Sequence, residues 1–229
     1  MKKAGDLYIP DRDTFFGPIF EESGDKFDEG SLLTALGIVS ASIGSDLENY
    51  SAIEVGAHVG SWTRILSRHF ARVSVFEPIA ENAACLIENT KGLGNVAIYL
   101  DALGVCNGKR KMAIGQNRHN SGTWHFDDDG GYLVTVSTLD DHFKSTTKQP
   151  CAFLKIDVEG FEEDVLLGGL EMIEREKPVI LLEMNELAER YGQSNERTIQ
   201  VLEDLNYSVR ARVNKDYVYD HESRFDAGF

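Results

Sequence analysis

The chain has 229 residues, enough for one α/β domain with a complete hydrophobic core and too few for a second complete domain. Its 38 acidic and 23 basic residues give a formal net charge of −15 at pH 7. A surface of that sign repels phosphate backbones and anionic lipids, so the composition argues against a nucleic-acid partner and against a membrane partner.

The cysteines and the N-terminal residues indicate a reduced, cytoplasmic protein. Cys85, Cys106 and Cys151 are odd in number and form neither a CxxC pair nor a zinc-type spacing. No apolar signal core follows the two lysines after Met1, and no stretch of the sequence approaches the length of a membrane span. We therefore expect neither export nor membrane insertion.

The first 48 residues are predicted to form an N-terminal arm and a helix that act as a lid or cap. Residues 1–30 are polar, with scattered aromatic side chains and no clear period. The run from Ser31 to Ile43 predicts a helix with Ser31 as its N-cap. The remaining residues, 49–229, are predicted to form the ligand-binding domain.

From residue 50 onward, short apolar strands alternate with helical segments. The expected strands cover 51–55, 73–76, 96–100, 152–156 and 179–182, and the expected helices cover 61–70, 80–90, 161–175 and 196–205. This rhythm with short links is typical of a parallel sheet that has helices on both faces. Two further strands, 110–114 and 132–136, flank a polar loop at 117–131 that could close over a ligand, and a hairpin is expected from Tyr207 onward.

The first of these strands ends in a glycine-rich turn that leads into a helix. The turn reads EVGAHVG from Glu54 to Gly60, and its glycines would let the backbone approach a nucleotide-like ligand. The spacing is GxxxG rather than GxGxxG, and His58 occupies the position where the dinucleotide fingerprint needs a glycine beside the pyrophosphate. The turn alone also fits a tight connection that binds nothing.

Acidic residues follow several of the predicted parallel strands. Glu77 lies about twenty residues beyond the glycines, where a carboxylate can accept hydrogen bonds from both hydroxyls of a ribose. Asp101 ends the third strand beside the expected adenine site, and Asp157 and Glu183 end the later strands. Because ligands of open α/β sheets bind at the carboxyl ends of strands, these residues are expected to line one crevice.

Together these motifs resemble the FkbM-type methyltransferases over about residues 52–185. The resemblance rests on IEVGAHVGSWT from Ile53, VFEP from Val75 with Asn82 and Asn89 after it, NSG at 120–122, TLDDHF at 138–143, and KIDVEGFEEDVLLGG from Lys155 with Pro178 and Glu183 behind it. It implies the Rossmann-like class I methyltransferase fold, an α/β architecture whose seven-stranded, mostly parallel sheet has helices on both faces and an antiparallel last strand. It also implies S-adenosylmethionine as methyl donor. Glu54 stands where the family usually has Asp, and His58 where it usually has Asn.

Ten residues are expected to contact S-adenosylmethionine: Glu54, Gly56, His58, Gly60, Ser61, Trp62, Glu77, Asp101, Ala102 and Asp157. Gly56 and Gly60 would admit the methionine moiety of the cofactor. The backbone N–H groups near Ser61 and Trp62 would hold its carboxylate, and Glu54 would help to hold its ammonium group.

The acceptor hydroxyl needs a base, because it must lose its proton as it attacks the methyl group. Asp157 and Glu159 are the expected catalytic residues, with His119 or His125 as alternatives. Lys155 is expected to pair with a carboxylate rather than to act in catalysis.

A second version of the site contains a divalent cation. Asp157, Glu183 and Asn185 lie at strand ends and carry the hard oxygen ligands that Mg²⁺ prefers over zinc. A bound metal would lower the pKa of the acceptor hydroxyl directly.

The expected function is S-adenosylmethionine-dependent O-methylation of a hydroxyl on a small molecule or sugar. Alternatives are a methyltransferase-like binding module without activity and a nicotinamide-dependent oxidoreductase, which the glycine spacing disfavours. An RNA methyltransferase is opposed by the net charge of −15. The oligomeric state stays open, although the N-terminal arm could exchange between two copies in a homodimer.

Overall fold

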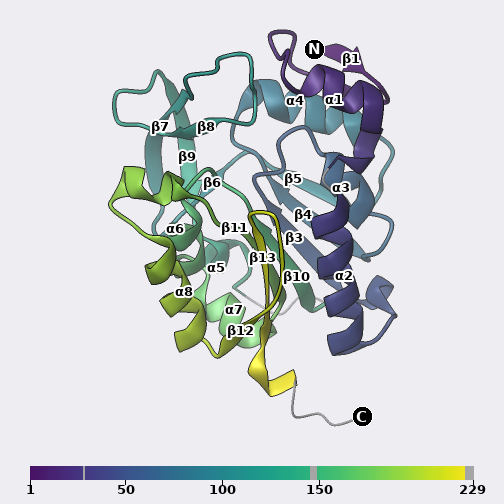
Figure 1. The fold of residues 1–229 in the computed structure, drawn as a ribbon, viewed down its shortest axis with the longest axis vertical. Coiled ribbons are helices and arrows are strands. Elements are labelled where there is room, and N and C mark those ends of the chain that lie inside the picture. The colour runs from purple at the N-terminus through teal and green to yellow at the C-terminus, as the bar shows by residue number, and fades with distance from the viewer. Residues whose placement is uncertain (28, 145–148, 225–229) are drawn as a thin grey trace.

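Apolar side chains alternate between two faces along the buried central strands. In β3 (Ser51–Val55), Ala52 packs into one hydrophobic cluster, whereas Ile53 and Val55 pack into another. Successive side chains of a strand point to opposite faces, so a strand that is apolar in both directions needs cover on both sides. The computed structural model describes residues 1–27, 29–144 and 149–224, and it shows that cover as two layers of helices (Figure 1).

The central sheet has seven strands within the described residues. Their order is β12 (Tyr207–Val213), β13 (Asp216–His221), β11 (Val179–Glu183), β10 (Cys151–Ile156), β3, β4 (Arg72–Phe76) and β5 (Val96–Tyr99). The strands from β11 to β5 run parallel, and β13, the last of the sheet, is antiparallel to both of its neighbours. The predicted fold class is therefore confirmed, including the antiparallel last strand.

Helices cover both faces of this sheet. One face packs against α2 (Glu29–Ile43), α3 (Ser61–Leu66) and α4 (Ala80–Asn89), and the other against α5 (Leu139–His142), α6 (Glu162–Leu167), α7 (Leu170–Glu176) and α8 (Asn195–Asp204). Short 3₁₀ turns are η1 (Gly24–Lys26), η2 (Leu47–Asn49), η3 (Glu186–Tyr191) and η4 (Glu222–Arg224). In the part of the chain that the structure describes, no helix is both long and apolar enough to span a membrane.

A second, smaller sheet stands beside the carboxyl edge of the central one. Its order is β6 (Ala102–Leu103), β9 (Tyr132–Ser137), β7 (Gly108–Ile114) and β8 (Trp124–Phe126). The sequence predicts β7 and β9 but not β6 and β8, because strands of two or three residues are too short to show a period of two. Met112, Phe126 and Val136 form its core together with Ile79 and Phe161 from the main domain.

The N-terminal arm folds onto α4 rather than extending into solvent (Figure 1). It contains β1 (Lys2–Ala4), β2 (Leu7–Ile9) and α1 (Phe16–Ser23). Asn89 at the end of α4 ties the arm down, because its amide nitrogen donates to the carbonyls of Tyr8 and Val59 at 2.8 Å, and its oxygen accepts from the Tyr8 N–H.

The prediction of Ser31 as an N-cap is wrong. Helix α2 begins at Glu29, so Ser31 lies inside the helix, and its side chain is buried on the same side as Leu32 and Ala35. Its hydroxyl has no hydrogen-bond partner in the described part of the chain. An N-cap side chain accepts from a free backbone N–H at the start of the helix, and the buried Ser31 hydroxyl makes no such bond.

The single helix predicted over 161–175 is also wrong, because it is broken into α6 and α7 at Gly168 and Gly169. A Cβ atom on Gly168 would lie 2.0 Å from the carbonyl oxygen of Gly104, and one on Gly169 would lie 2.8 Å from Leu139 Cδ1. The two glycines let the loop after β6 and the start of α5 approach the helix backbone, and that approach interrupts the helix.

We predict opposite effects on stability from two Gly→Ala substitutions. Gly168→Ala should lower the free energy of unfolding by about 1–3 kcal/mol, because the added methyl group overlaps a backbone oxygen. Gly37→Ala should raise it by about 0.4–1 kcal/mol, because Gly37 lies inside α2 and no described atom beyond its chain neighbours and the local helix backbone lies within 4 Å of its Cβ position. Urea unfolding followed by circular dichroism measures both, and effects of equal sign would contradict the assigned contact.

Candidate active site

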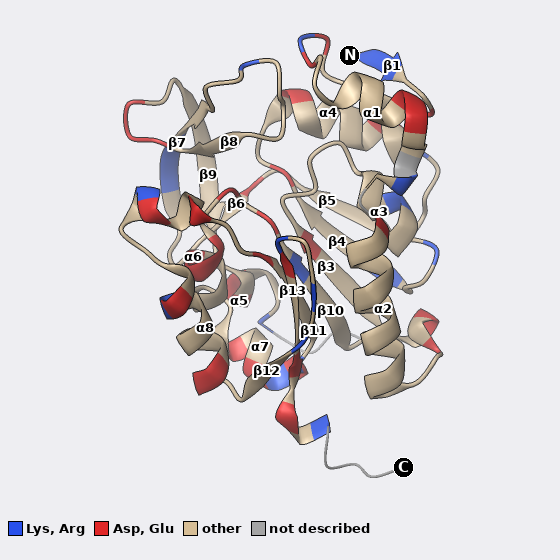
Figure 2. Ribbon diagram, in the orientation of Figure 1, with Lys and Arg blue, Asp and Glu red and all other residues tan. Residues whose placement is uncertain are grey.

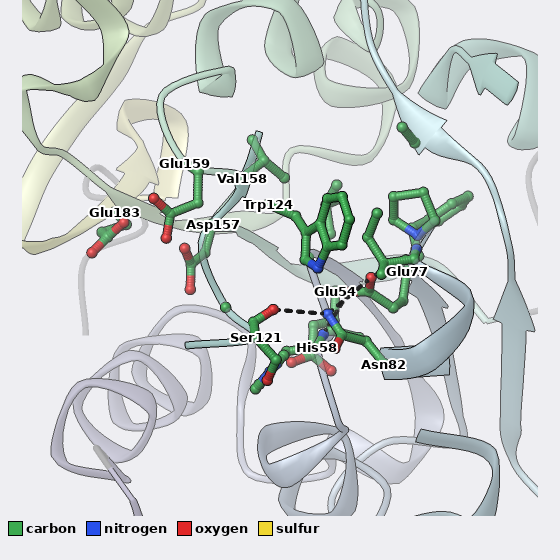
Figure 3. Close-up of a pocket in the computed structure, with 18 of the residues that line it drawn as sticks. Glu54, His58, Glu77, Asn82, Ser121, Trp124, Asp157, Val158, Glu159 and Glu183 are labelled. Atoms are coloured by element: carbon green, nitrogen blue, oxygen red, sulfur yellow. Dashed lines mark hydrogen bonds between the residues drawn. The ribbon is translucent and has the colours of Figure 1, made fainter. Parts of the chain in front are cut away.

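A cavity of about 300 Å³ opens at the carboxyl ends of the central strands. Its walls come from the turn after β3, from the ends of β4, β10 and β11, from the smaller sheet and from the N-terminal arm (Figure 3). Figure 2 shows acidic residues in the loops at these strand ends. Nine of the ten predicted cofactor residues line it: Glu54, Gly56, His58, Ser61, Trp62, Glu77, Asp101, Ala102 and Asp157.

The tenth, Gly60, does not line the cavity. It adopts a left-handed conformation with φ of +86°, and a Cβ atom there would lie 2.5 Å from Leu86 Cδ1 in α4. Gly60 therefore lets α3 start close against α4, and its contact with the methionine moiety stays a prediction. Gly56 also has a packing role, because its Cβ would lie 1.9 Å from the carbonyl oxygen of Asp157.

Glu77 lies at the end of β4 and is 5% exposed. Its two carboxylate oxygens accept hydrogen bonds from the backbone N–H groups of His58, at 2.9 Å, and Ile79, at 3.0 Å. Burial raises the pKa of Glu77 to about 7, against the opposing effect of these hydrogen bonds. The carboxylate thus fixes the glycine turn and also presents acceptor capacity to the cavity.

A buried ammonium group joins the turn to β10. The Nζ atom of Lys155 donates to the carbonyl of Gly56 at 2.8 Å and lies 3.3 Å from Asp157 and 3.9 Å from Glu54. Burial raises the pKa of Glu54 to about 7, although Lys155 and the hydroxyl of Thr63, which donates at 2.6 Å, favour its charged form. The structure thus pairs Lys155 with carboxylates, as the sequence predicts.

Three acidic residues form the rim of the cavity beside β10 and β11. Asp157, Glu159 and Glu183 all line it. Burial, and then the neighbouring Asp157, raise the pKa of Glu159 to about 7 and that of Glu183 to about 8. A carboxylate that titrates near neutral pH can accept and return a proton, so the rim has groups suited to general-base catalysis.

The backbone of this rim is strained. Glu159 has φ of +58°, a left-handed conformation that residues with a side chain rarely adopt. Gly160 follows with φ of +99°, and a Cβ atom there would lie 2.5 Å from the backbone of Leu187. Strain of this kind is concentrated at functional sites, where the surrounding fold holds it in place.

The arrangement of the predicted magnesium ligands does not support a metal site. The oxygen of Asn185 accepts from the N–H of Leu187 at 2.9 Å, and its amide nitrogen donates to Glu183 at 2.7 Å, so the amide turns a donor toward its supposed fellow ligand. Asn185 does not line the cavity. Among the described residues, no group of three His, Cys, Asp or Glu side chains has a geometry that could hold a metal ion.

The histidines proposed as alternative bases lie outside the cavity. The ring of His119 contacts the carbonyl of Arg12 at 3.2 Å, and that of His125 contacts the carbonyl of Thr123 at 3.1 Å. Trp124 does line the cavity, and its indole N–H donates to Glu81 at 3.3 Å.

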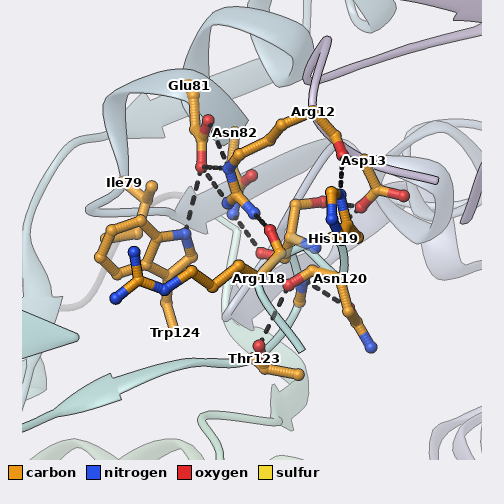
Figure 4. A network of polar contacts seen from close by, with 12 residues as sticks. Arg12, Asp13, Ile79, Glu81, Asn82, Arg118, His119, Asn120, Thr123 and Trp124 are labelled. Carbon is orange, nitrogen blue, oxygen red and sulfur yellow. Dashed lines mark hydrogen bonds and ion pairs between the residues drawn. The ribbon is translucent and has the colours of Figure 1, made fainter. Parts of the chain in front are cut away.

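The arm contributes residues that the sequence does not identify as part of the site. Phe16, Phe20 and Phe27 line the cavity. Arg12 forms an ion pair with Glu81 and donates to the carbonyl of Arg118, which fastens the arm to α4 and to the loop before β8 (Figure 4). Residues before position 30 show no period, so their place in the site follows only from the tertiary contacts.

Two residues of the quoted motifs acquire a place in the site that the sequence does not assign. Asn82 and Ser121 line the cavity, and the Asn82 amide nitrogen donates to the Ser121 carbonyl at 3.1 Å. The Asn82 side-chain oxygen is buried without a hydrogen-bond partner in the described residues. A buried acceptor without a partner is costly, so this oxygen is suited to a donor group of a ligand.

We predict that the ligand-free protein loses stability as the pH rises. Because the folded-state pKa values of Glu54, Glu77 and Glu159 are about 7, above their ordinary value, the folded protein binds protons that the unfolded chain releases. The free energy of unfolding should therefore fall between about pH 5 and pH 8. Urea unfolding across this range measures it. Glu54→Gln should flatten the slope, and a rise in stability toward pH 8 would contradict the raised pKa values.

Comparison with known sequences identifies the family of the chain. A model of the FkbM methyltransferase domain matches residues 54–209, more than half of the chain. A comparison with curated proteins finds no match. Among solved structures, an FkbM methyltransferase from Methylobacillus flagellatus is 17% identical, with a TM-score of 0.49. The alignment covers 80% of this chain and 47% of that one, so the chain spans about half the length of that protein.

Two further structures share the architecture. SMU.1697c from Streptococcus mutans, solved with SAH, is 11% identical with a TM-score of 0.50, over 82% of this chain and 95% of that one. The N-methyltransferase NodS from Bradyrhizobium japonicum is 12% identical with a TM-score of 0.49, over 91% and 92% of the two chains. At identities this low, the likenesses bear on the fold alone.

Proposed function

The chain belongs to the FkbM methyltransferase family, and from that premise we propose that it transfers the methyl group of S-adenosylmethionine to a hydroxyl oxygen of a small molecule or sugar. The observation that carries the proposal is one cavity that unites Glu77 at the end of β4, the glycine turn after β3 and the acidic rim of β10 and β11. Hydrogen-bond acceptors dominate its polar wall, and S-adenosylmethionine carries matching donors: two ribose hydroxyls, an adenine amine and an ammonium group.

In this proposal the residues that would hold the cofactor lie at the ends of β3, β4 and β5. Glu77 accepts from the ribose hydroxyls, and Asp101 and Ala102 lie beside the adenine. The turn at Gly56 and His58 holds the methionine moiety. The orphaned oxygen of Asn82 supports this fit, because it is a buried acceptor that the chain itself leaves unused.

The rim residues would handle the acceptor hydroxyl. When bound, S-adenosylmethionine supplies a methyl group on a positively charged sulfur. A carboxylate of the rim would accept the hydroxyl proton as the methyl group is transferred from sulfur to oxygen. Glu159 suits that role better than Asp157, because its pKa is raised to about 7 and Asp157 is paired with Lys155. Asp157 would then orient the acceptor, and positioning of two reactants can itself contribute roughly 7–11 kcal/mol.

The net charge supports one class of methyl acceptor. The net charge of −15 supports an uncharged or cationic small molecule or saccharide as acceptor, rather than a nucleic acid or a membrane surface. A cytoplasmic location and a homodimer formed through the arm remain predictions. Magnesium has no support from the arrangement of Asp157, Glu183 and Asn185, so the proposed reaction uses the protein's own carboxylates.

The proposal is tested first by calorimetric titration with S-adenosylmethionine, S-adenosylhomocysteine and NAD. We expect binding of the two adenosyl-amino acid ligands and none of NAD. Glu77→Ala should weaken the binding of S-adenosylmethionine by roughly 10- to 150-fold, because hydrogen bonds to a charged group contribute about 1.5–3 kcal/mol. Glu48→Ala, an exposed glutamate in η2, is the control and should bind as the wild type does. Binding of NAD alone would replace the proposal with an oxidoreductase, and binding of none of the three would favour the inactive binding module.

A second test addresses the base. Once a screen of hydroxyl-bearing compounds with methyl-labelled S-adenosylmethionine identifies an acceptor, Glu159→Gln should lower kcat by about 10²- to 10⁴-fold at pH 7. The affinity for S-adenosylmethionine should not change. Glu189→Gln, an exposed glutamate in η3, should retain full turnover. A fully active Glu159→Gln variant would transfer the role of base to another residue of the rim.

A further inference from the structure

A chain of buried polar groups runs from the N-terminal arm to the glycine turn. Asp13 of the arm, Ser121 of the loop before β8 and His58 of the turn are joined by hydrogen bonds. Asp13 and Ser121 are both 0% exposed. Asp13 also lies outside the family-matched residues 54–209, so this link is a feature of the whole chain rather than of the matched domain.

The Asp13 carboxylate accepts hydrogen bonds from four donors. One oxygen accepts from the backbone N–H groups of Phe15, at 2.9 Å, and Phe16, at 2.7 Å. The other accepts from the N–H of Ser121 at 2.8 Å and from its hydroxyl at 2.5 Å. Backbone N–H groups can only donate, so both oxygens of Asp13 act as acceptors here.

This arrangement determines where the proton of His58 lies. The Ser121 hydroxyl has a single hydrogen, which it donates to Asp13, so its oxygen must accept from His58 Nε2 at 2.7 Å. The Nε2 atom therefore carries a proton. Burial lowers the pKa of His58 to about 4, so the ring is neutral at pH 7 and its Nδ1 atom has a free lone pair.

The free Nδ1 atom has no protein donor in the described part of the chain. His58 lines the cavity, and its ring packs against Phe16 with centroids 4.8 Å apart. Asn82 lies next to it, held by the Ser121 carbonyl, with its own oxygen unused. Ser121 thus supports two acceptors at the cavity wall, which match a ligand that brings N–H or O–H groups.

We propose that Asp13 is a positioning residue of the cofactor site: through the Ser121 hydroxyl it keeps the His58 proton on Nε2, so that Nδ1 accepts a hydrogen bond from the bound cofactor. The inference rests on the proposed function, because the donor is an N–H or O–H group of S-adenosylmethionine. In this role, Asp13 makes the N-terminal arm part of the cofactor site. The arm is held in register by the N–H groups of Thr14 and Phe15, which both donate to the carbonyl of His119.

Asp13→Asn is the informative substitution. An asparagine keeps the shape of the side chain, but its NH₂ group cannot accept. The oxygen of Asp13 near Phe15 and Phe16 faces two backbone N–H donors, whereas the oxygen near Ser121 faces one. The NH₂ group of the asparagine should therefore take the position near Ser121, where it would donate to the Ser121 hydroxyl. Ser121 would then donate to His58 Nε2, and the proton would move to Nδ1. An amide in place of a histidine-orienting carboxylate is known to select the wrong tautomer in this way.

The test combines a spectroscopic and a thermodynamic measurement. ¹⁵N NMR of histidine-labelled, ligand-free protein reports which ring nitrogen carries the proton, and the His58 signals are assigned by their loss in His58→Asn. We expect the Nε2–H form in the wild type and a shift toward Nδ1–H in Asp13→Asn, with at least a tenfold loss of S-adenosylmethionine affinity. An Nδ1–H wild type, or an unchanged tautomer in Asp13→Asn, overturns the inference.

Matched variants separate this role from simple anchoring of the arm. Asp11→Asn, whose side chain is 76% exposed and pairs with the terminal amine, should change neither readout. In a His58→Asn background, which restores the residue usual in the family, Asp13→Asn should cost no further affinity, since no imidazole remains to orient. An equal loss in both backgrounds would mean that Asp13 only holds the arm, and would overturn the inference.

Ser121→Ala provides a second route if Asp13→Asn does not fold. It removes the hydroxyl that joins the chain and leaves the three backbone donors on Asp13. A His58 tautomer that stays wholly Nε2–H in Ser121→Ala, with unchanged affinity, overturns the inference. A wild type that binds no S-adenosylmethionine removes the proposed function and the role of Nδ1 with it, whereas a wild type that binds the cofactor and shows Nδ1–H overturns this inference alone.

Discussion

The site depends on the interactions of the buried Lys155 ammonium group with one carbonyl and two carboxylates. This group holds the carbonyl of Gly56 and the carboxylates of Asp157 and Glu54, so it ties the glycine turn after β3 to the acidic end of β10. Removal of one partner from such a buried group of charges typically costs about 3–5 kcal/mol, because the remaining charges are left uncompensated. Gly56 completes the junction, since a side chain there would overlap the carbonyl of Asp157.

Around this junction, buried carboxylates and a strained backbone lower the stability of the fold. Burial raises the pKa of Glu77, Glu159 and Glu183 toward or above neutrality, and each would be more stable as a solvated carboxylate. Glu159 also sits in a left-handed backbone conformation, held by the close packing of Gly160 against η3. Buried carboxylates whose pKa lies near neutral pH can accept and return a proton, as general-base catalysis requires.

The N-terminal arm closes the same cavity from the other side. Its aromatic residues Phe16 and Phe20 line the wall, and Asp13 reaches the glycine turn through Ser121. Several hydrogen bonds join the arm to the loop before β8, and the ion pair of Arg12 with Glu81 joins the arm to α4. The arm therefore helps to form the wall of the cavity.

The sequence by itself determined the alternation of strands and helices, the parallel sheet and the part of the cavity wall that lies at the strand ends. These follow from local patterns: apolar strands, a glycine turn and acidic residues at strand ends must converge at one edge of a parallel sheet. Tertiary structure alone decided what sequence spacing does not encode. Asn185 turns its amide nitrogen toward Glu183, Gly60 serves packing against α4, and Asp13 reaches His58 across more than forty residues. The direction of a side chain and the close approach of two backbones depend on which distant segments pack together. Local sequence patterns carry no information on that packing.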